Sequence, residues 1–226
     1  MTFPDFKGRV AVVTGGSRGI GAAACRLLAA SGARVAAVAR AEGPLQDLVD
    51  ELRWLGSDAI GVVADCADPE SVTELHDSVV AELGPASVVL AFAGGDPAPA
   101  TVLDLDPEAW FHAVRADLTA TFLTVRAFLP AMLAAGSGAI VTMGAPDAPP
   151  SSTNAGFAAA RAGVEAFTRQ VAAEVQDSGV RVNCLAGGFD SAPPADVAFA
   201  ALYLASTAAS CINATTLAIA GGKLRL

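Results

Sequence analysis

The sequence predicts one α/β domain of the Rossmann type, a doubly wound, seven-stranded parallel sheet flanked by helices. Short apolar runs alternate with longer amphipathic segments along the chain. The short runs are nearly continuous in Val, Ile, Leu and Ala, which is typical of strands buried on both faces of a parallel sheet. Strand–helix alternation at this spacing places helices on both faces. The 226 residues fit one such domain and show no linker or repeat, so we expect a single domain over residues 1–226.

The expected strands and helices alternate. We expect strands at residues 9–14, 34–39, 59–65, 86–93, 138–143, 180–186 and 215–220. We expect helices at residues 19–31, 44–55, 69–83, 107–135, 154–178 and 195–206. Gly32 fits a left-handed helix end, and the pairs Asp68-Pro69 and Asp106-Pro107 fit an N-cap followed by a first-turn proline. The Pro- and Ser-rich segment 145–152 follows the fifth strand, at the edge where open α/β sheets bind ligands.

The composition restricts the possible partners. The net charge of −9 makes nucleic acid and anionic membranes poor partners, and an anionic cofactor would need a local positive site. Hydrophobic residues make up 53% of the chain and charged residues 16%, so we expect some apolar surface to be buried in an oligomer. No apolar run reaches the roughly 18 residues of a membrane helix, and residues 1–8 do not resemble a signal peptide.

The cysteines indicate a cytoplasmic protein. Cys25, Cys66, Cys184 and Cys211 are widely spaced and form no C-x-x-C pair. We therefore expect buried, reduced thiols in a cytosolic protein. No His, Cys or Asp cluster has the spacing of metal ligands, so no metal site is expected.

A glycine-rich turn lies between the first expected strand and the first expected helix. In the segment 14–21, TGGSRGIG, Gly15 allows a tight turn, Gly19 lets a pyrophosphate approach the backbone, and Gly21 lets helix and strand pack closely. The helix N-terminus then presents free N–H groups and the positive end of its dipole. With Asp65 at the end of the third strand, the turn indicates a nucleotide cradle; the alternative is a structural turn without a ligand.

The chain resembles the short-chain dehydrogenase/reductase family over residues 7–222. The resemblance lies in TGGSRGIG, in DCAD at 65–68, AG at 93–94, RAGV at 161–164, VRVN at 180–183 and AGG at 220–222. It implies that Asp65 and Cys66 flank the adenine of a nicotinamide cofactor, with Ala93 and Gly94 beside the adenosine ribose. The implied cofactor-binding residues are Gly15, Ser17, Arg18, Gly19, Ile20, Gly21, Arg40, Asp65, Cys66, Ala93, Gly94, Arg161 and Gly188.

The end of the second strand favours NADP(H) over NAD(H). An NAD site has an acidic residue there to bind the ribose 2′-hydroxyl. Here the strand ends in Ala39 and Arg40, and the next acid is Glu42. Arg40 and Arg18 are both placed to meet a 2′-phosphate, which a guanidinium binds in bidentate fashion. The alternative is that both arginines are solvated surface residues.

The positions that implement proton transfer in the family hold other residues here. In the family a Tyr protonates the nascent alkoxide, a Ser polarises the carbonyl, a Lys lowers the pKa of the Tyr, and an Asn relays protons. The matching positions are Phe157, Ala145, Arg161 and Asp117. Phe cannot act as a general acid, and Arg stays protonated and cannot relay a proton. Only residues 189–195 remain of the usual substrate-covering segment, so we expect the standard carbonyl reduction to be lost.

Three functions remain open. The chain is a family member that binds NADP(H) without ordinary turnover, or a cyclase, lyase or isomerase with Asp117 as acid or base, or a reductase of an iminium or activated alkene. Asp117 is the one catalytic candidate, because nearby Phe92, Phe157 and Met143 would desolvate it and raise its pKa. The alternative is a structural carboxylate that binds backbone N–H groups near a helix irregularity.

The expected partners are the nucleotide and a small apolar molecule. The resemblance also implies a homodimer or homotetramer formed through the helices at 107–135 and 154–178, or a hetero-oligomer with an active family member. Tyr203, the one tyrosine of the chain, is expected in the core rather than in the site.

Overall fold

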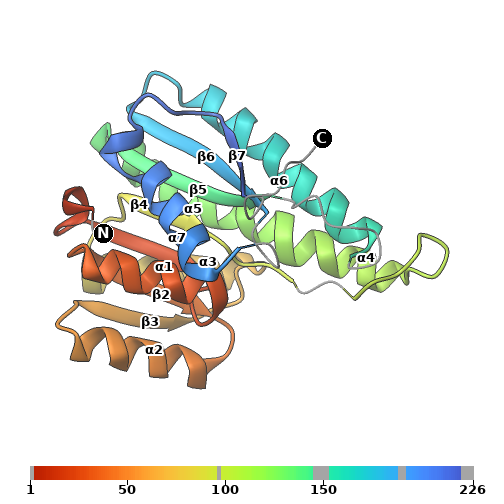
Figure 1. Cartoon of the computed structure of the whole chain (residues 1–226), viewed down its shortest axis with the longest axis horizontal. Coiled ribbons are helices and arrows are strands. Elements are labelled where there is room, and N and C mark those ends of the chain that lie inside the picture. The colour runs from red at the N-terminus through yellow and green to blue at the C-terminus, as the bar shows by residue number, and fades with distance from the viewer. Residues whose placement is uncertain (1–2, 96–97, 145–152, 188–191, 220–226) are drawn as a thin grey trace.

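The computed structural model describes residues 3–95, 98–144, 153–187 and 192–219. Seven parallel strands form one sheet in the order β3-β2-β1-β4-β5-β6-β7, which confirms the predicted fold class (Figure 1). The order reverses between β1 and β4, where open α/β sheets bind their ligands. The strands are β1 (Val10–Thr14), β2 (Arg34–Ala39), β3 (Ala59–Val63), β4 (Val88–Ala91), β5 (Gly138–Gly144), β6 (Val180–Gly187) and β7 (Thr216–Ile219).

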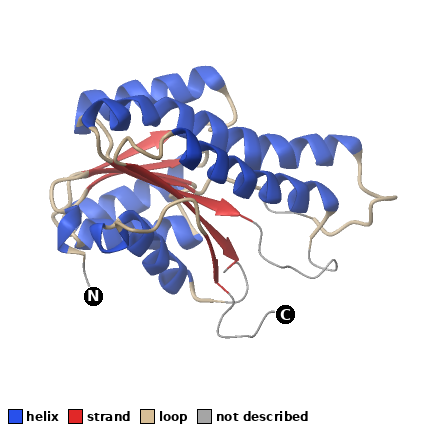
Figure 2. Ribbon diagram, turned by 90° about the horizontal axis from the view of Figure 1, so that it is seen from above, coloured by secondary structure: helices blue, strands red, loops and turns tan. Residues whose placement is uncertain are grey.

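Helices cover both faces of the sheet (Figure 2). One hydrophobic cluster joins the sheet to α1, α2 and α7, and a second joins it to α3, α5 and α6. The helices are α1 (Gly19–Ala30), α2 (Glu42–Trp54), α3 (Pro69–Leu83), α4 (Pro107–Ala113), α5 (Ala120–Ala135), α6 (Ala155–Glu174) and α7 (Pro194–Ala205), with 3-10 turns at Pro4–Phe6 and Thr207–Ala209.

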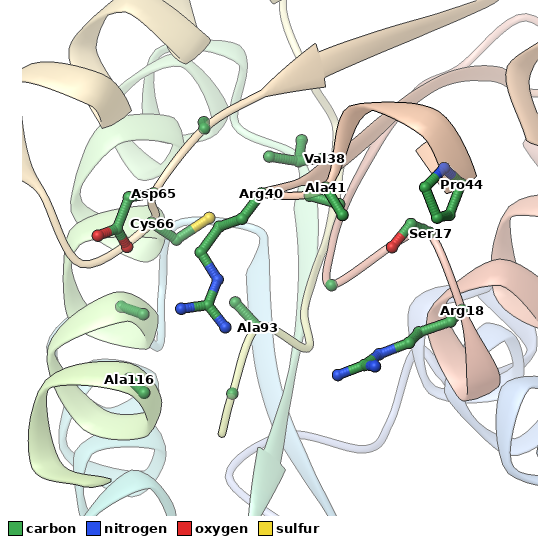
Figure 3. A pocket seen from close by; sticks show the side chains of 15 residues that line it. Ser17, Arg18, Val38, Arg40, Ala41, Pro44, Asp65, Cys66, Ala93 and Ala116 are labelled. Atoms are coloured by element: carbon green, nitrogen blue, oxygen red, sulfur yellow. The ribbon is translucent and has the colours of Figure 1, made fainter. Parts of the chain in front are cut away.

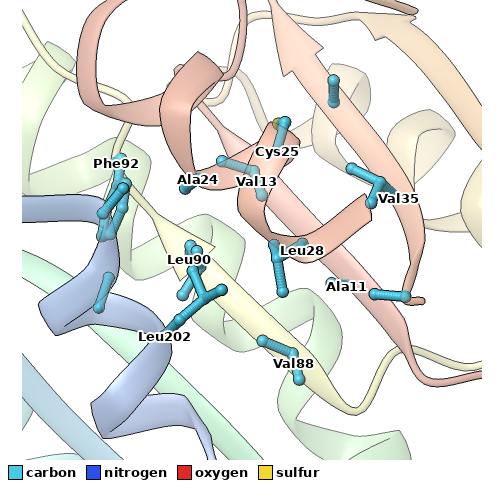
Figure 4. Close-up of a cluster of buried hydrophobic side chains, with 14 of the residues drawn as sticks. Ala11, Val13, Ala24, Cys25, Leu28, Val35, Val88, Leu90, Phe92 and Leu202 are labelled. Carbon is cyan, nitrogen blue, oxygen red and sulfur yellow. The ribbon is translucent and has the colours of Figure 1, made fainter. Parts of the chain in front are cut away.

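The core behind the glycine-rich turn is built from the predicted apolar strands. Val13 of β1 and Leu90 of β4 pack against Cys25 and Leu28 of α1 and Leu202 of α7, and all five are fully buried (Figure 4). Burying such side chains contributes about 1.5–3 kcal/mol each for the larger aliphatic residues. This packing fixes α1 against β1, and with it the glycine-rich turn that joins them.

The outermost strands are more exposed than predicted. Both β3 and β7 were expected to be buried on both faces, but β3 alternates in exposure and Val63 is 53% exposed. Every described residue of β7 is at least partly exposed. The reason is position, because these strands lie at the two edges of the sheet and each has one strand neighbour. The prediction for the thiols is also wrong in one case, since Cys211 is exposed while Cys25, Cys66 and Cys184 are buried.

The long helix predicted at residues 107–135 is interrupted. A π-helical turn at Val114–Thr119 separates α4 from α5, with an extra residue per turn that redirects the side chains that follow. The stretch Pro107–Ala135 is long enough to span a membrane, and its most apolar 18-residue window has a mean hydropathy of 1.5 and is 39% buried. In this fold it packs against α3, α6 and the sheet.

Other boundaries agree to within a few residues. The predicted caps are confirmed: Asp68 accepts a hydrogen bond from the Ser71 N–H, and Asp106 accepts one from the Glu108 N–H. Gly32 has a φ of 80°, as its position at the end of α1 requires. Helix α2 begins at Glu42, two residues before its predicted start, because Pro44 falls in the first turn, where its missing N–H has no helical partner to lose.

Candidate nucleotide-binding site

The glycine-rich turn has the geometry of a phosphate cradle. Gly15 has a φ of 68°, and a Cβ there would lie 2.7 Å from the Phe92 carbonyl oxygen. A Cβ on Gly21 would collide with the Gly15 carbonyl, so this glycine allows the first turn of α1 to close on the strand. Gly19 has a φ of 55° and open space where a Cβ would stand. Helix α1 has no side-chain cap and no acidic residue in its first turn, so its first N–H groups face this space.

Two adjoining hollows, of about 370 Å³ and 330 Å³, meet at Gly15, Arg18 and Gly94. We call the first the adenosine hollow, because the sequence resemblance implies that Asp65, Cys66, Ala93 and Gly94 flank an adenosine, and the second the inner hollow. Every predicted cofactor residue that the structure describes lines one or both of them. Gly188 lies outside the described residues, as do the whole segment 145–152, including Ala145, and residues 189–191 of the segment 189–195. The adenosine hollow is lined by Gly15, Ser17, Arg18, Arg40, Asp65, Cys66, Ala93 and Gly94, and the inner hollow by Gly15, Arg18, Gly19, Ile20, Gly21, Gly94 and Arg161.

Two arginines extend into the adenosine hollow. Arg40 comes from the end of β2 and Arg18 from the turn before α1 (Figure 3). Both are exposed, and neither guanidinium forms a hydrogen bond or an ion pair with another residue in the described part of the chain. The hollow is therefore locally positive on a chain whose net charge is −9, and both guanidinium groups are available to an anion.

Asp65 is held in place at the far end of the same hollow. One of its carboxylate oxygens accepts a hydrogen bond from the Ala67 N–H at 2.9 Å. The other accepts one from Nη2 of Arg115, at 3.2 Å, which reaches across from the π-helical turn. Arg115 was not predicted as a site residue; it lies in the π-helical turn, two residues before Asp117, where one interpretation of the sequence placed a helix irregularity.

The inner hollow is mostly apolar. Ile20, Phe92, Met143 and Pro194 contribute to its wall, and Arg161 is the charged residue deepest in the fold among those lining it, at 2% exposed. Pro194 lies at the start of α7 and lines this hollow together with residues of the glycine-rich turn. The Thr14 hydroxyl fixes Phe92 by accepting hydrogen bonds from the N–H groups of Phe92 and Ala93.

A buried ion pair occupies the predicted proton-relay positions. Nη2 of Arg161 lies 2.7 Å from Oδ1 of Asp117, and the two side chains are 3% and 1% exposed. Nη1 of Arg161 donates to the Met143 carbonyl at 2.7 Å, and Oδ1 of Asp117 also accepts from the Gly95 N–H at 3.2 Å. Asp117 lies in the π-helical turn and lines neither hollow. This geometry favours the second interpretation of Asp117, a structural carboxylate that binds a backbone N–H group.

Burial sets the electrostatics of this pair. Desolvation raises the pKa of the Asp117 carboxyl above its usual range, while the charge of Arg161 and the Gly95 N–H act in the opposite direction. Desolvation likewise lowers the pKa of Arg161, against the opposing effect of Asp117. Oδ2 of Asp117 is buried and has no hydrogen-bond partner among the described residues. The pair is therefore poorly solvated, and each charge depends on the other.

Phe157 packs where the family has its proton donor. It begins the inward face of α6, at a position fixed by the N-cap, because the Asn154 side chain accepts a hydrogen bond from the Phe157 N–H at 3.0 Å. Its ring is 5% exposed and lies 5.3 Å from Cζ of Arg161, a cation–π contact. No ionisable hydrogen is present at this position. Burial also raises the pKa of the nearby Cys184 to about 11, so this residue is a neutral thiol rather than a nucleophile.

Other titratable residues lie away from the hollows. Tyr203 packs against the core from α7, as predicted, and His112 is exposed on α4. His76 is on α3, where its ring contacts Phe128. Within residues 3–95, 98–144, 153–187 and 192–219, no three His, Cys, Asp or Glu side chains are grouped closely enough to hold a metal ion.

Comparison with known proteins identifies the family. The model of the short chain dehydrogenases matches residues 9–196. The chain belongs to the short-chain dehydrogenase family. Among curated proteins it is 38% identical to a cis-4-hydroxycyclohexanecarboxylate dehydrogenase from Sinomonas cyclohexanicum, over 96% of this chain and 97% of that protein. It is 32% identical to the 3-oxoacyl-[acyl-carrier-protein] reductase FabG of Escherichia coli, over 82% of this chain and 75% of that reductase.

A solved structure gives the same fold. The 3-oxoacyl-[acyl-carrier protein] reductase with bound NAD from Brucella melitensis superimposes with a TM-score of 0.91 and 26% identity, over 99% of this chain and 94% of that one. The alignment with the Sinomonas dehydrogenase spans 242 positions, more than the 226 residues of this chain, so that enzyme has residues that this family member lacks.

Proposed function

We propose that this short-chain dehydrogenase family member binds NADP(H) and does not catalyse the ordinary carbonyl reduction of the family. The observation on which this rests is the buried Asp117–Arg161 pair packed on Phe157. It replaces the proton donor with a ring that has no ionisable hydrogen, and the relay with a carboxylate and a guanidinium that bind each other. The named relatives are dehydrogenases and reductases, so this chain would depart from them in chemistry while keeping their fold.

The adenosine hollow supports the choice of cofactor. Arg18 and Arg40 provide two guanidinium groups without protein partners in the described residues, at the place where an NAD-specific site has an acid. The glycine-rich turn, the open space at Gly19 and the uncapped start of α1 suit the pyrophosphate. When bound, the cofactor would supply the hydride; the residues of this chain would bind its phosphates and shield one side of the inner hollow with Ile20 and Phe92.

Nucleotide titration tests this proposal. We expect NADPH to bind more tightly than NADH in calorimetric titrations, because the 2′-phosphate gains charge-assisted hydrogen bonds. Arg40→Ala should weaken NADPH binding roughly 10- to 100-fold, since such bonds contribute about 1.5–3 kcal/mol, and should leave NADH binding nearly unchanged. Arg169→Ala, an exposed arginine of α6 that lines neither hollow, is the matched control. Tighter binding of NADH would overturn the cofactor assignment, and binding of neither would overturn the nucleotide site.

A second candidate is the reduction of a substrate that needs no proton donor. Hydride transfer from NADPH to a preformed iminium carbon gives a neutral amine and NADP⁺, and the bond forms without any proton being added. The apolar wall of Phe92, Met143 and Pro194 would suit such a substrate. Consumption of NADPH with a cyclic iminium, and none with the matching ketone, would establish this function. The use of Asp117 as a general acid or base has less support, because Arg161 and Gly95 engage one of its oxygens and it lines neither hollow.

A further inference from the structure

We infer that this site recognises the 2′-phosphorylated adenosine diphosphate half of its ligand and gains little from the nicotinamide half. The ligand class would then include adenosine 2′-phosphate 5′-diphosphate nucleotides that have no nicotinamide. The inference rests on the proposed nucleotide binding and concerns where in the site the affinity arises.

Among the described residues, the groups free to bind a ligand face the adenosine and diphosphate parts of the nucleotide, across the adenosine hollow and the part of the inner hollow at Gly19. Arg18 and Arg40 point into the adenosine hollow, and the cradle at Gly19 opens on the first turn of α1. Asp65 is already oriented by Arg115 and Ala67, so the adenine edge meets a carboxylate that needs no rearrangement. Pre-positioned partners of this kind bind without an ordering cost.

Two charged side chains line the described part of the inner hollow: Arg18, which it shares with the adenosine hollow, and Arg161, which is already used within the protein. In the family a Tyr hydroxyl and a Lys ammonium occupy positions 157 and 161; here Phe157 has no hydroxyl. The guanidinium of Arg161 is directed to the Met143 carbonyl, the Asp117 carboxylate and the face of the Phe157 ring. A ribose entering this hollow from the Gly94 side therefore meets apolar side chains and a cation that already has partners.

Moving the Arg161 guanidinium away from its protein partners to bind a ligand would cost considerable free energy. Turning it toward a ribose would leave the Asp117 carboxylate buried beside Gly95 without its counter-charge, which is strongly unfavourable. The ion pair is also tightly packed against Gly94. A Cβ at this glycine would collide with Nη2 of Arg161 and would lie 2.5 Å from Oδ1 of Asp117. The ion pair thus fixes the inner hollow in a form that binds the nicotinamide half weakly.

Paired titrations of NADPH and adenosine 2′-phosphate 5′-diphosphate test the inference. We expect their dissociation constants to differ by less than about tenfold, which corresponds to less than about 1.4 kcal/mol. A preference for NADPH of tenfold or more would overturn the inference while leaving the proposed function intact. Binding of neither nucleotide would overturn the proposed function itself, so the two failures are distinguishable.

Variants at the two ends separate the contributions further. The triple change Asp117→Asn, Phe157→Tyr and Arg161→Lys should tighten the binding of NADPH and leave that of adenosine 2′-phosphate 5′-diphosphate unchanged. Arg40→Ala should weaken both nucleotides by the same factor. If Arg40→Ala weakens the nicotinamide-free nucleotide alone, the affinity for NADPH arises at the inner hollow and the inference is wrong. Circular dichroism of each variant checks that it is folded.

Discussion

Removing one partner of the Asp117–Arg161 pair should destabilise the protein far more than removing both. We compare Arg161→Met, Asp117→Leu and the double variant, each of which replaces a charge with an apolar side chain of moderate size. Each single change leaves a buried charge without its counter-charge, whereas the double change leaves two apolar groups beside Phe157 and Met143. Replacing a whole buried pair with apolar residues is often neutral or stabilising.

The distance between the two charges sets the size of the expected loss in unfolding free energy. At 2.7 Å and an effective dielectric constant of 20, the attraction between the two charges is about 6 kcal/mol. Desolvation offsets part of this, as the shifted pKa values of both groups indicate. Loss of one partner of such a pair typically costs about 3–5 kcal/mol of unfolding free energy. For a chain of this size each kcal/mol lowers Tm by roughly 2–4 °C, so we expect a fall of roughly 6–20 °C in each single variant.

The pH dependence of the unfolding free energy distinguishes Arg161→Met from Asp117→Leu. In Arg161→Met the Asp117 carboxyl keeps the desolvation that raises its pKa and loses the charge that lowered it. A carboxyl whose folded pKa lies above its unfolded pKa gives stability that is present below the unfolded pKa and is lost as pH rises through the folded pKa. Arg161→Met should therefore recover stability, relative to the wild type, as pH falls from 8 to 5. Asp117→Leu has no such carboxyl and should not recover.

Chemical and thermal unfolding at several pH values measures these effects as a double-mutant cycle. We expect a coupling free energy of at least about 2 kcal/mol between positions 117 and 161, because contacting charged residues are strongly non-additive. Additive single variants, or an Arg161→Met protein as stable as the wild type at pH 8, would refute the reasoning. Either result would mean that Asp117 is not held as a buried carboxylate.

Three further predictions concern function and assembly. The wild-type protein should show no measurable NADPH-dependent reduction of ordinary ketones or aldehydes, since a general acid contributes about 10²–10⁴ in rate and one polarising donor about 10²–10³; a normal enzymatic rate of NADPH oxidation would contradict this. The changes Ala145→Ser, Phe157→Tyr and Arg161→Lys together should still not restore robust ketone reduction, because only residues 189–195 of the sequence stand where the family has its substrate-covering segment, and water would then reach the reacting centre; efficient turnover by this triple variant would show that the segment matters little. Light scattering should find an oligomer that dissociates in a Phe122→Glu, Leu133→Glu variant, because these side chains are 43% and 40% exposed on α5; a dilute wild-type monomer would refute it.

The sequence predicted the scaffold because its signals are local. The apolar runs, the glycine-rich turn and the caps at Asp68 and Asp106 each follow from a few adjacent residues, and the structure has all of them. The exposure of β3 and β7 could not be predicted in this way. An edge strand rich in Val, Ile and Ala has the same apolar pattern as a central strand. Only the order of strands in the sheet determines which strands have a single neighbour.

The arrangement of the inner hollow depends on contacts distant in the sequence. Asp117 and Arg161 were each identified as departures from the family pattern, but their pairing joins the π-helical turn to α6 and has no local signature. Hydrophobic periodicity did not reveal the π-helical turn, because one inserted residue changes the phase of a helix without breaking its apolar character. The contact of Arg115 with Asp65 was missed for the same reason.

The buried pair also predicts how this site varies among related chains. Loss of the Asp117 carboxylate alone strands the Arg161 guanidinium, which already contacts the Met143 carbonyl and the Phe157 ring. In chains that share Phe157, we therefore expect an acid at position 117 to occur together with a cation at position 161. The two positions should change together rather than singly.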